Sequence, residues 1–151
     1  MRKLNSRGFT LLELLLSVAI ISLLAGLSLP VYRILISKND LDIAAATIVQ
    51  SLRRAQVLSQ AVSEDEDGVD ILWGVKVLND SIVIFKGTSY ATRDSDFDEE
   101  FDMPATVDVG ATNEVVFTKF TGFPTATGTI NLTTEGDSRS IAVNEKGTIT
   151  Y

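Results

Sequence analysis

The chain has 151 residues, enough for one domain and a membrane anchor, and it contains neither cysteine nor histidine. Disulfide frameworks, thiolate nucleophiles and cysteine metal sites are therefore excluded, as are the commonest general base and the commonest metal ligand. Residues 1–37 carry four bases and one acid, a net charge of +3, whereas residues 38–151 carry nine bases and nineteen acids, a net charge of −10. An acidic C-terminal part argues against nucleic-acid binding, because affinity for phosphate backbones comes from basic side chains.

Three basic residues, Arg2, Lys3 and Arg7, lie in the first eight positions, which contain no acid. The positive-inside rule therefore predicts a cytoplasmic N-terminus and a C-terminal part on the other side of the membrane. A secretory signal peptide has its small residue after the apolar run, whereas Gly8 lies before it. Cleavage after Gly8 would remove the leader alone and leave the apolar run on the mature chain.

The apolar run extends from Phe9 to Tyr32, and Glu13 is its single charged side chain. As a helix rising about 1.5 Å per residue, it is long enough to cross a hydrocarbon core of about 30 Å. We therefore expect a single-pass membrane helix over residues 9–36. A carboxylate inside a bilayer costs about 2.5–3.5 kcal/mol, so Glu13 predicts a functional group that needs a partner.

Together, the basic leader, Gly8, the sequence Phe9-Thr10-Leu11-Leu12-Glu13 and an apolar helix with Pro30 near its end resemble one known signal. It is the N-terminal signal of type IV pilins and type II secretion pseudopilins. In that family a membrane protease, the prepilin peptidase, cuts after the glycine and methylates the new N-terminal amine. An ordinary signal anchor that contains a glutamate is the alternative reading.

The resemblance implies cleavage between Gly8 and Phe9 and N-methylation of Phe9. It implies that Glu13 pairs with the N-terminal amine of a neighbouring subunit during assembly. The partners would be prepilin peptidase, other pilin subunits that pack through the N-terminal helix, and the inner (cytoplasmic) membrane. The C-terminal domain would be periplasmic or extracellular.

The helical pattern continues past Pro30, which therefore predicts a kink or a loosened segment rather than the end of the helix. Small or apolar residues then recur at alternating steps of four and three, which places them on one helix face: Leu41, Ala45, Ile48, Leu52, Ala55, Ser59 and Val62. We expect one helix from about Phe9 to about Ser63, transmembrane in its first half and amphipathic in its second.

An acidic run, Glu64-Asp65-Glu66-Asp67-Gly68, follows this helix and predicts a solvated turn. The more specific alternative is that this run forms an EF-hand calcium-binding loop. Its twelfth position requires a glutamate, and a loop beginning at Ser63 would place Gly74 there. The template therefore fails.

Residues 71–78 and 81–86 are rich in β-branched and aromatic side chains and flank Asn79-Asp80, which predicts a β-hairpin with Trp73 in the core. The following segment, Tyr90 to Asp102, is dense in acids. We expect it to form a solvated loop held by Phe97 and Phe101.

The C-terminal third alternates apolar and polar residues in four predicted strands, Val115–Phe120, Gly128–Thr133, Ser140–Val143 and Thr148–Tyr151. They predict an antiparallel sheet with one buried face. The expected fold class is α+β: a long N-terminal helix packed on an antiparallel sheet, as in type IV pilins.

A second resemblance is more dispersed. Several segments are similar to GspH/FimT-type minor pseudopilins and minor pilins: Leu52–Gln56, Trp73–Val75, Val116-Phe117 with Gly122, Gly128–Leu132 and Ile141–Ile149. Some FimT-type pilins take up DNA through a basic C-terminal region, but the last thirty residues here contain only Arg139 and Lys146 as bases. The resemblance implies a structural subunit of a secretion pseudopilus or a type IV pilus, two machines that the N-terminal signal does not distinguish.

The expected organisation is a leader (residues 1–8), a transmembrane and assembly helix (9–36) and a globular domain (37–151). The sequence predicts no catalytic residue, cofactor or metal-ligand set. The alternative is a membrane-anchored extracytoplasmic enzyme or metal-binding domain that uses segment 94–102, with the acids Asp94, Asp96, Asp98, Glu99, Glu100 and Asp102. Such a site would need these acids to be ordered around a concave pocket.

Overall fold

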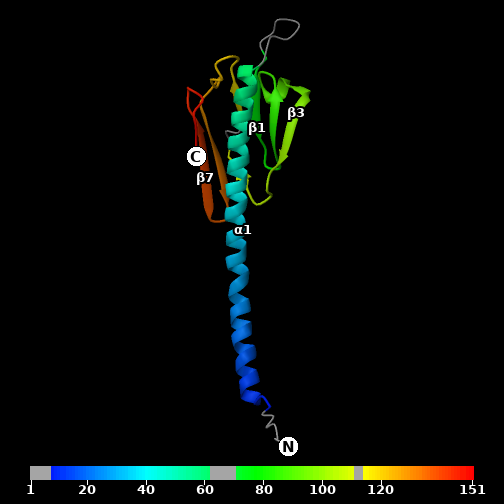
Figure 1. Cartoon of the computed structure of the whole chain (residues 1–151), viewed down its shortest axis with the longest axis vertical. Coiled ribbons are helices and arrows are strands. Elements are labelled where there is room, and N and C mark those ends of the chain that lie inside the picture. Colours follow the sequence, from blue (N-terminus) through cyan, green and yellow to red (C-terminus); the bar gives the residue numbers. More distant parts are fainter. Residues whose placement is uncertain (1–7, 62–70, 111–113) are drawn as a thin grey trace, which may run out of the picture. The chain divides into compact units, whose positions relative to one another are not determined.

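The computed structural model describes residues 8–61, 71–110 and 114–151, and at residues 27–30 it describes the backbone alone. The chain divides into two compact units, residues 1–35 and 36–151. The elements in chain order (Figure 1) are α1 (Leu11–Ala61), β1 (Trp73–Val77), β2 (Ser81–Lys86), the 3-10 turn η1 (Tyr90–Thr92), β3 (Asp94–Asp102), β4 (Asp108–Val109), β5 (Glu114–Phe117), β6 (Gly128–Thr134), β7 (Asp137–Val143) and β8 (Ile149–Thr150).

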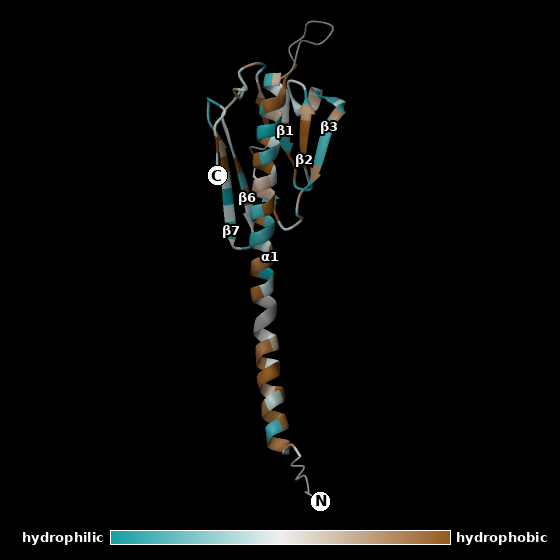
Figure 2. Cartoon of the chain, viewed as in Figure 1, coloured by the Kyte–Doolittle hydropathy of each residue, from teal (hydrophilic) through white to brown (hydrophobic). Residues whose placement is uncertain are grey.

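The N-terminal unit contains the first half of α1, whose apolar side chains face outward all around the helix. Every large apolar side chain described between Leu11 and Leu35 is more than half exposed, and Figure 2 shows hydrophobic colours along this part of α1. Among the described residues, α1 is the one helix long and apolar enough to cross a membrane, by length and composition. A helix that is apolar on all sides is typical of burial in lipid or among other helices.

The second unit is built around residues 36–61 of α1. The predicted stripe is confirmed: Leu41, Ala45, Ile48, Leu52, Ala55 and Ser59 are all buried. Val62, the last member of the predicted stripe, and the acidic run 64–68 lie outside the described residues. The small residues Ala44 and Ala45 let the helix approach the strands closely, and each fully buried leucine or isoleucine contributes about 1.5–3 kcal/mol.

The strands form two antiparallel four-stranded sheets, with orders β3-β2-β1-β5 and β4-β6-β7-β8. Both sheets contribute to one hydrophobic core with α1. From the first sheet this core includes Val75, Ile82 and Phe117, and from the second Ile130 and Ile141. Figure 1 shows strands of the two sheets on either side of the second half of α1. The expected α+β arrangement of a long helix on antiparallel strands is thus confirmed, but the single predicted sheet is wrong.

The centre of the first sheet is buried on both faces. Ile82 and Ile84 of β2 belong to the core with α1, whereas Val83 and Phe85 point the other way and are still buried. The Phe85 ring lies above Gly74, paired with it on β1, and meets the Tyr90 ring edge-on at 5.8 Å. Tyr90 of η1 therefore helps to cover the outer face of this sheet. In the second sheet, β6 and β7 alternate buried residues with exposed or half-buried ones, which confirms the single buried face predicted for these C-terminal strands.

Segment 90–102 was expected to be a loop, and this expectation is wrong for most of its length. Residues 94–102 form β3, which pairs with β2 and lies at the edge of the first sheet. Phe97 and Phe101 do anchor it in part: Phe97 contacts Trp73 edge-on at 6.4 Å, and Phe101 pairs with Ile82. Cross-strand contacts and ion pairs override the low β-propensity of aspartate and glutamate here.

Four smaller features also differ from the sequence expectations. β5 ends at Phe117, because the backbone turns at Phe120, whose φ is +64°, and at Gly122. β8 comprises two residues, and β4 was not predicted. The helix begins at Leu11, two residues later than expected.

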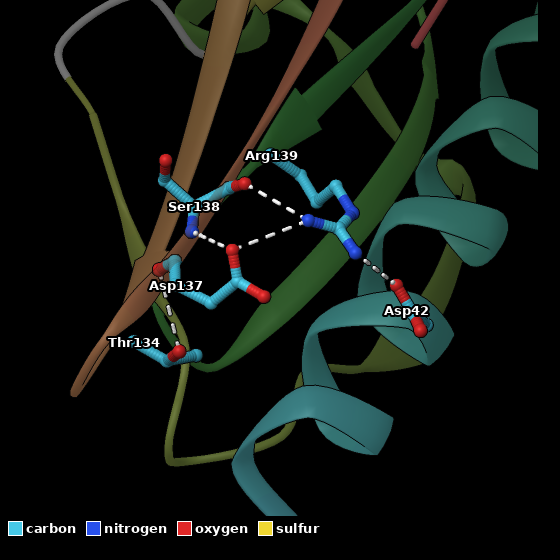
Figure 3. Close-up of polar contacts among 5 residues, drawn as sticks. All are labelled: Asp42, Thr134, Asp137, Ser138 and Arg139. Atoms are coloured by element: carbon cyan, nitrogen blue, oxygen red, sulfur yellow. Dashed lines mark hydrogen bonds and ion pairs between the residues drawn. The ribbon is translucent and has the colours of Figure 1, made fainter. Parts of the chain in front are cut away.

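Among the described residues, one ion pair joins α1 to each sheet. Arg54 contacts Glu99 of β3 at 2.7 Å. Arg139 of β7 contacts Asp42 of α1 at 3.1 Å and Asp137 of its own strand at 3.3 Å, and Figure 3 shows its guanidinium between these two carboxylates. These pairs are partly exposed, so they fix the approach of the elements more than they add stability.

Candidate processing and assembly site

The site predicted from the N-terminal signal begins at the first turn of α1. Residues 8–10 are not helical, and α1 starts at Leu11. The backbone amide of Glu13 donates to the Thr10 hydroxyl at 3.3 Å and to the Thr10 carbonyl at 3.1 Å. Thr10 is therefore the N-cap of α1, which satisfies an amide that has no partner within the helix.

The resemblance to pilins assigns no role to Thr10, but the structure shows that this residue belongs to the site. The spacing that identifies it is Thr10-x-x-Glu13, the pattern of a capping box, in which a threonine caps the helix and a glutamate follows three residues later. The cap fixes where the helix begins. It thereby places Phe9 before the helix and Glu13 in its first turn.

Gly8 and Phe9 are both exposed. Phe9 is 77 % exposed, and no described atom lies within 4 Å of the place where a Cβ on Gly8 would sit. The fold itself therefore imposes no requirement for glycine at this position. A requirement for Gly8 would have to come from a protein that binds this backbone.

Glu13 presents an exposed carboxylate within an apolar surface. Its backbone carbonyl accepts a 2.7 Å hydrogen bond from Ser17, but within the described residues its carboxylate makes neither a hydrogen bond nor an ion pair. A carboxylate on a membrane-length apolar helix needs compensation when it is removed from water. The described part of this chain does not supply it.

Pro30 lies in the same helix, seventeen positions after Glu13. The backbone is helical on both sides of it, so Pro30 does not end α1. The kink expected at this residue stays a prediction.

Residues 3–29 match the family model described as the prokaryotic N-terminal methylation motif. The match contains Gly8, Phe9, Thr10 and Glu13. It supports a type IV pilin-like family and indicates a prepilin substrate of the pilin or pseudopilin kind. Neither the curated proteins nor the solved structures gave a match.

The motif also bears on partners and location. It implies processing by prepilin peptidase and assembly with other pilin subunits, and together with the long apolar helix it fits a membrane-anchored pilin. It favours a structural subunit over an enzyme.

The acidic segment 94–102 was the candidate site of the alternative function. As part of a strand, its acids spread along the sheet edge instead of converging: Glu99 shares the α1-facing side of the sheet with Ile84, whereas Glu100 pairs with Val83 on the other side. Asp98 and Glu99 are already paired with Arg93 and Arg54, at 2.8 and 2.7 Å. In the part of the chain that the structure describes, no group of three acids could hold a metal ion.

Arg93 completes a polar cluster on the outer side of the first sheet. Its guanidinium lies 3.8 Å from the centre of the Tyr90 ring, and the hydrogen bond to Asp98 raises the pKa of Arg93 above its usual value. The Tyr90 amide donates to Glu114, which also contacts Lys76 at 3.3 Å. Each charged group here has an opposite partner, so the arrangement holds η1 on the sheet and resembles a structural network more than a catalytic one.

Proposed function

We propose that this chain is a minor pseudopilin or minor pilin, a structural subunit of a type II secretion pseudopilus or a type IV pilus. Prepilin peptidase cleaves it between Gly8 and Phe9 and methylates the Phe9 amine. The mature chain stays in the inner membrane with its C-terminal domain outside the cytoplasm, and then enters a filament by packing of its N-terminal helix.

The observation that carries the proposal is the carboxylate of Glu13, which lies within the methylation motif and has no partner among the described residues. When apolar helices leave the bilayer and pack together, both Glu13 and the amine of Phe9 are buried. A lone buried charge costs several kcal/mol, whereas a pair between Glu13 and the amine of a neighbouring subunit offsets this cost. The same pair selects one axial register, because the amine and the carboxylate meet at a single offset between neighbours.

Replacement of Glu13 tests the proposal. Glu13→Gln keeps the shape of the side chain and removes its charge, so we expect a cleaved, membrane-resident protein that enters filaments poorly. Glu13→Asp keeps the charge and should enter better than Glu13→Gln. The measurement is the amount of each variant in purified filaments, expressed in competition with the wild-type chain and quantified by mass spectrometry.

Ser17→Ala is the matched control, because Ser17 lies one turn further along α1 and its hydroxyl bonds only to the Glu13 carbonyl among the described groups. It should enter filaments like the wild type. Equal incorporation of Glu13→Gln and wild type would overturn the pairing mechanism.

A further inference from the structure

The outer face of the second sheet differs from the rest of the globular unit in charge. Its inner face packs on α1 through Ile130, Leu132, Ile141 and Val143. The outward positions of its strands are exposed or half-buried, and they carry short polar side chains and one alanine: Thr129, Asn131, Thr133, Ser138, Ser140, Ala142 and Thr150. Asp108 of β4 is the one charged residue at the outward strand positions of this sheet. In a part of the chain with a net charge of −10, this face is nearly neutral.

An open hollow of about 450 Å³ lies at one end of this face, where β6 begins and β7 ends. Its floor crosses three strands in register, because Thr129 pairs with Ala142 and Ala142 pairs with Thr150. Thr127, Asn144 and Glu145 from the adjoining loops complete its wall. The volume lies within the range of small-molecule sites.

The hydrogen-bonding groups around the hollow are largely unengaged. The side chains of Thr127, Thr129, Thr150 and Glu145 make no hydrogen bond or ion pair with any described residue. The amide of Asn144 is oriented, since its oxygen accepts from the backbone amides of Lys146 at 3.0 Å and Thr148 at 2.8 Å. Its NH₂ group is therefore the part left to donate to a ligand.

This combination of groups selects one class of ligand. The lining contains a carboxylate and no base, which disfavours anions, and one carboxylate is too few for a tightly held metal cation. Threonine hydroxyls both donate and accept, Asn144 donates and Glu145 accepts, which matches a molecule with many hydroxyl groups. The Ala142 methyl and the backbone of Gly128 give the floor a small apolar area against which the C–H face of a sugar ring can lie.

We propose that this hollow binds a neutral sugar unit of a glycan. Next to the hollow, the neutral Ser/Thr/Asn face provides a surface for the rest of the glycan. This surface neither repels nor attracts the glycan by charge. The proposal goes beyond the assembly role and does not depend on it.

The test is saturation-transfer difference NMR on the full-length mature chain, in micelles of a detergent without a sugar headgroup. The probes are neutral saccharides (cellobiose, maltose and N,N′-diacetylchitobiose), with glucuronic acid as the anionic probe. At least one neutral saccharide should receive saturation from the wild-type chain, whereas glucuronic acid should not. Thr129→Val removes one hydroxyl and keeps the side-chain shape, so affinity should fall about two- to tenfold, the loss expected for one hydrogen bond. Ala142→Phe fills the floor and should abolish the signal.

Thr133→Val is the matched control, because Thr133 lies on the same strand and outward face but does not line the hollow. It should leave binding unchanged, and unchanged amide spectra will verify the fold of all three variants. The proposal is overturned if no neutral saccharide receives saturation. It is likewise overturned if Thr133→Val weakens binding as much as Thr129→Val, or if glucuronic acid binds as well as the neutral probes.

Discussion

The packing of the fold explains why position 74 is a glycine but does not explain the glycine at position 8. A Cβ on Gly74 would lie 2.5 Å from the tip of the buried Phe85 ring, so the packing of the first sheet accounts for glycine there. A Cβ on Gly8 would meet no described atom. If Gly8 is required, the requirement reflects recognition by a protein that must approach the backbone closely.

Gly8→Val should therefore block processing without disturbing insertion or folding. The added side chain would hinder access to the scissile bond in a peptidase, while the chain itself has room for it. Mass spectrometry of membrane fractions should find a precursor that retains residues 1–8, whereas the wild-type chain should begin at methylated Phe9. Gly26→Val is the control, because it adds the same side chain at an equally open position. A mature N-terminus on Gly8→Val would contradict the assignment of the cleavage site.

At the scale of elements, β3 is the clearest case of tertiary contacts deciding a local structure. Six of its nine residues are acids, a composition that disfavours strands. It nevertheless pairs with β2, and Arg54 and Arg93 neutralise two of its acids from α1 and from the end of η1. As an edge strand lined with acids, it also resists pairing with further strands, which protects the sheet from aggregation.

Hydrogen exchange can test the assignment of β3 as a strand. Because β3 pairs on one side alone, we expect alternate amides over Glu99–Asp102 to be protected and those between them to exchange fast. NMR-detected exchange on the full-length chain in micelles would measure this, with the exposed turn residues Ala105 and Thr106 as the unprotected reference. Fast exchange at every amide of the segment would mean that it is a loop.

The elements that could be predicted from the sequence are those whose pattern is local. The helix face from Leu41 to Ser59 follows from its period, and the β1–β2 hairpin follows from alternation around Asn79-Asp80. The division into two sheets could not be predicted in this way, because it depends on β5 pairing with β1 across about forty residues of sequence. In the candidate site, the motif indicated Gly8, Phe9 and Glu13. The hollow on the second sheet could not be predicted, because it depends on the register between β6, β7 and β8, which composition does not encode.

At the scale of the whole molecule, the two compact units differ in where their apolar side chains lie. Up to Leu35 these side chains face outward, whereas after Ile36 most of them enter a core shared with both sheets. The second unit buries its own apolar surface, so we expect it to fold without the first.

A fragment of residues 36–151 should therefore be a soluble, cooperatively unfolding domain. In it, Leu52→Ala should lower the free energy of unfolding by about 2–5 kcal/mol, since Leu52 is fully buried. Val57→Ala, at a position 60 % exposed on the same helix, should change it by less than about 0.5 kcal/mol. Urea titration followed by the fluorescence of Trp73, the single tryptophan, would measure both. Equal effects of the two substitutions would show that the Leu52 face is not core.

The side chain of Gln56 joins α1 to two loops that lie against each other: its amide nitrogen donates to the carbonyl of Gly122 at 2.9 Å and to that of Gly147 at 3.2 Å. Among the described residues, no strand of one sheet pairs with a strand of the other, so α1 is the element that both sheets share. The strands of each sheet are therefore joined to those of the other through α1 and the shared core, and not by strand pairing. Because α1 is made first during synthesis, it can serve as a template that is complete before the strands arrive. We therefore expect that either sheet can dock on α1 before the other is in place.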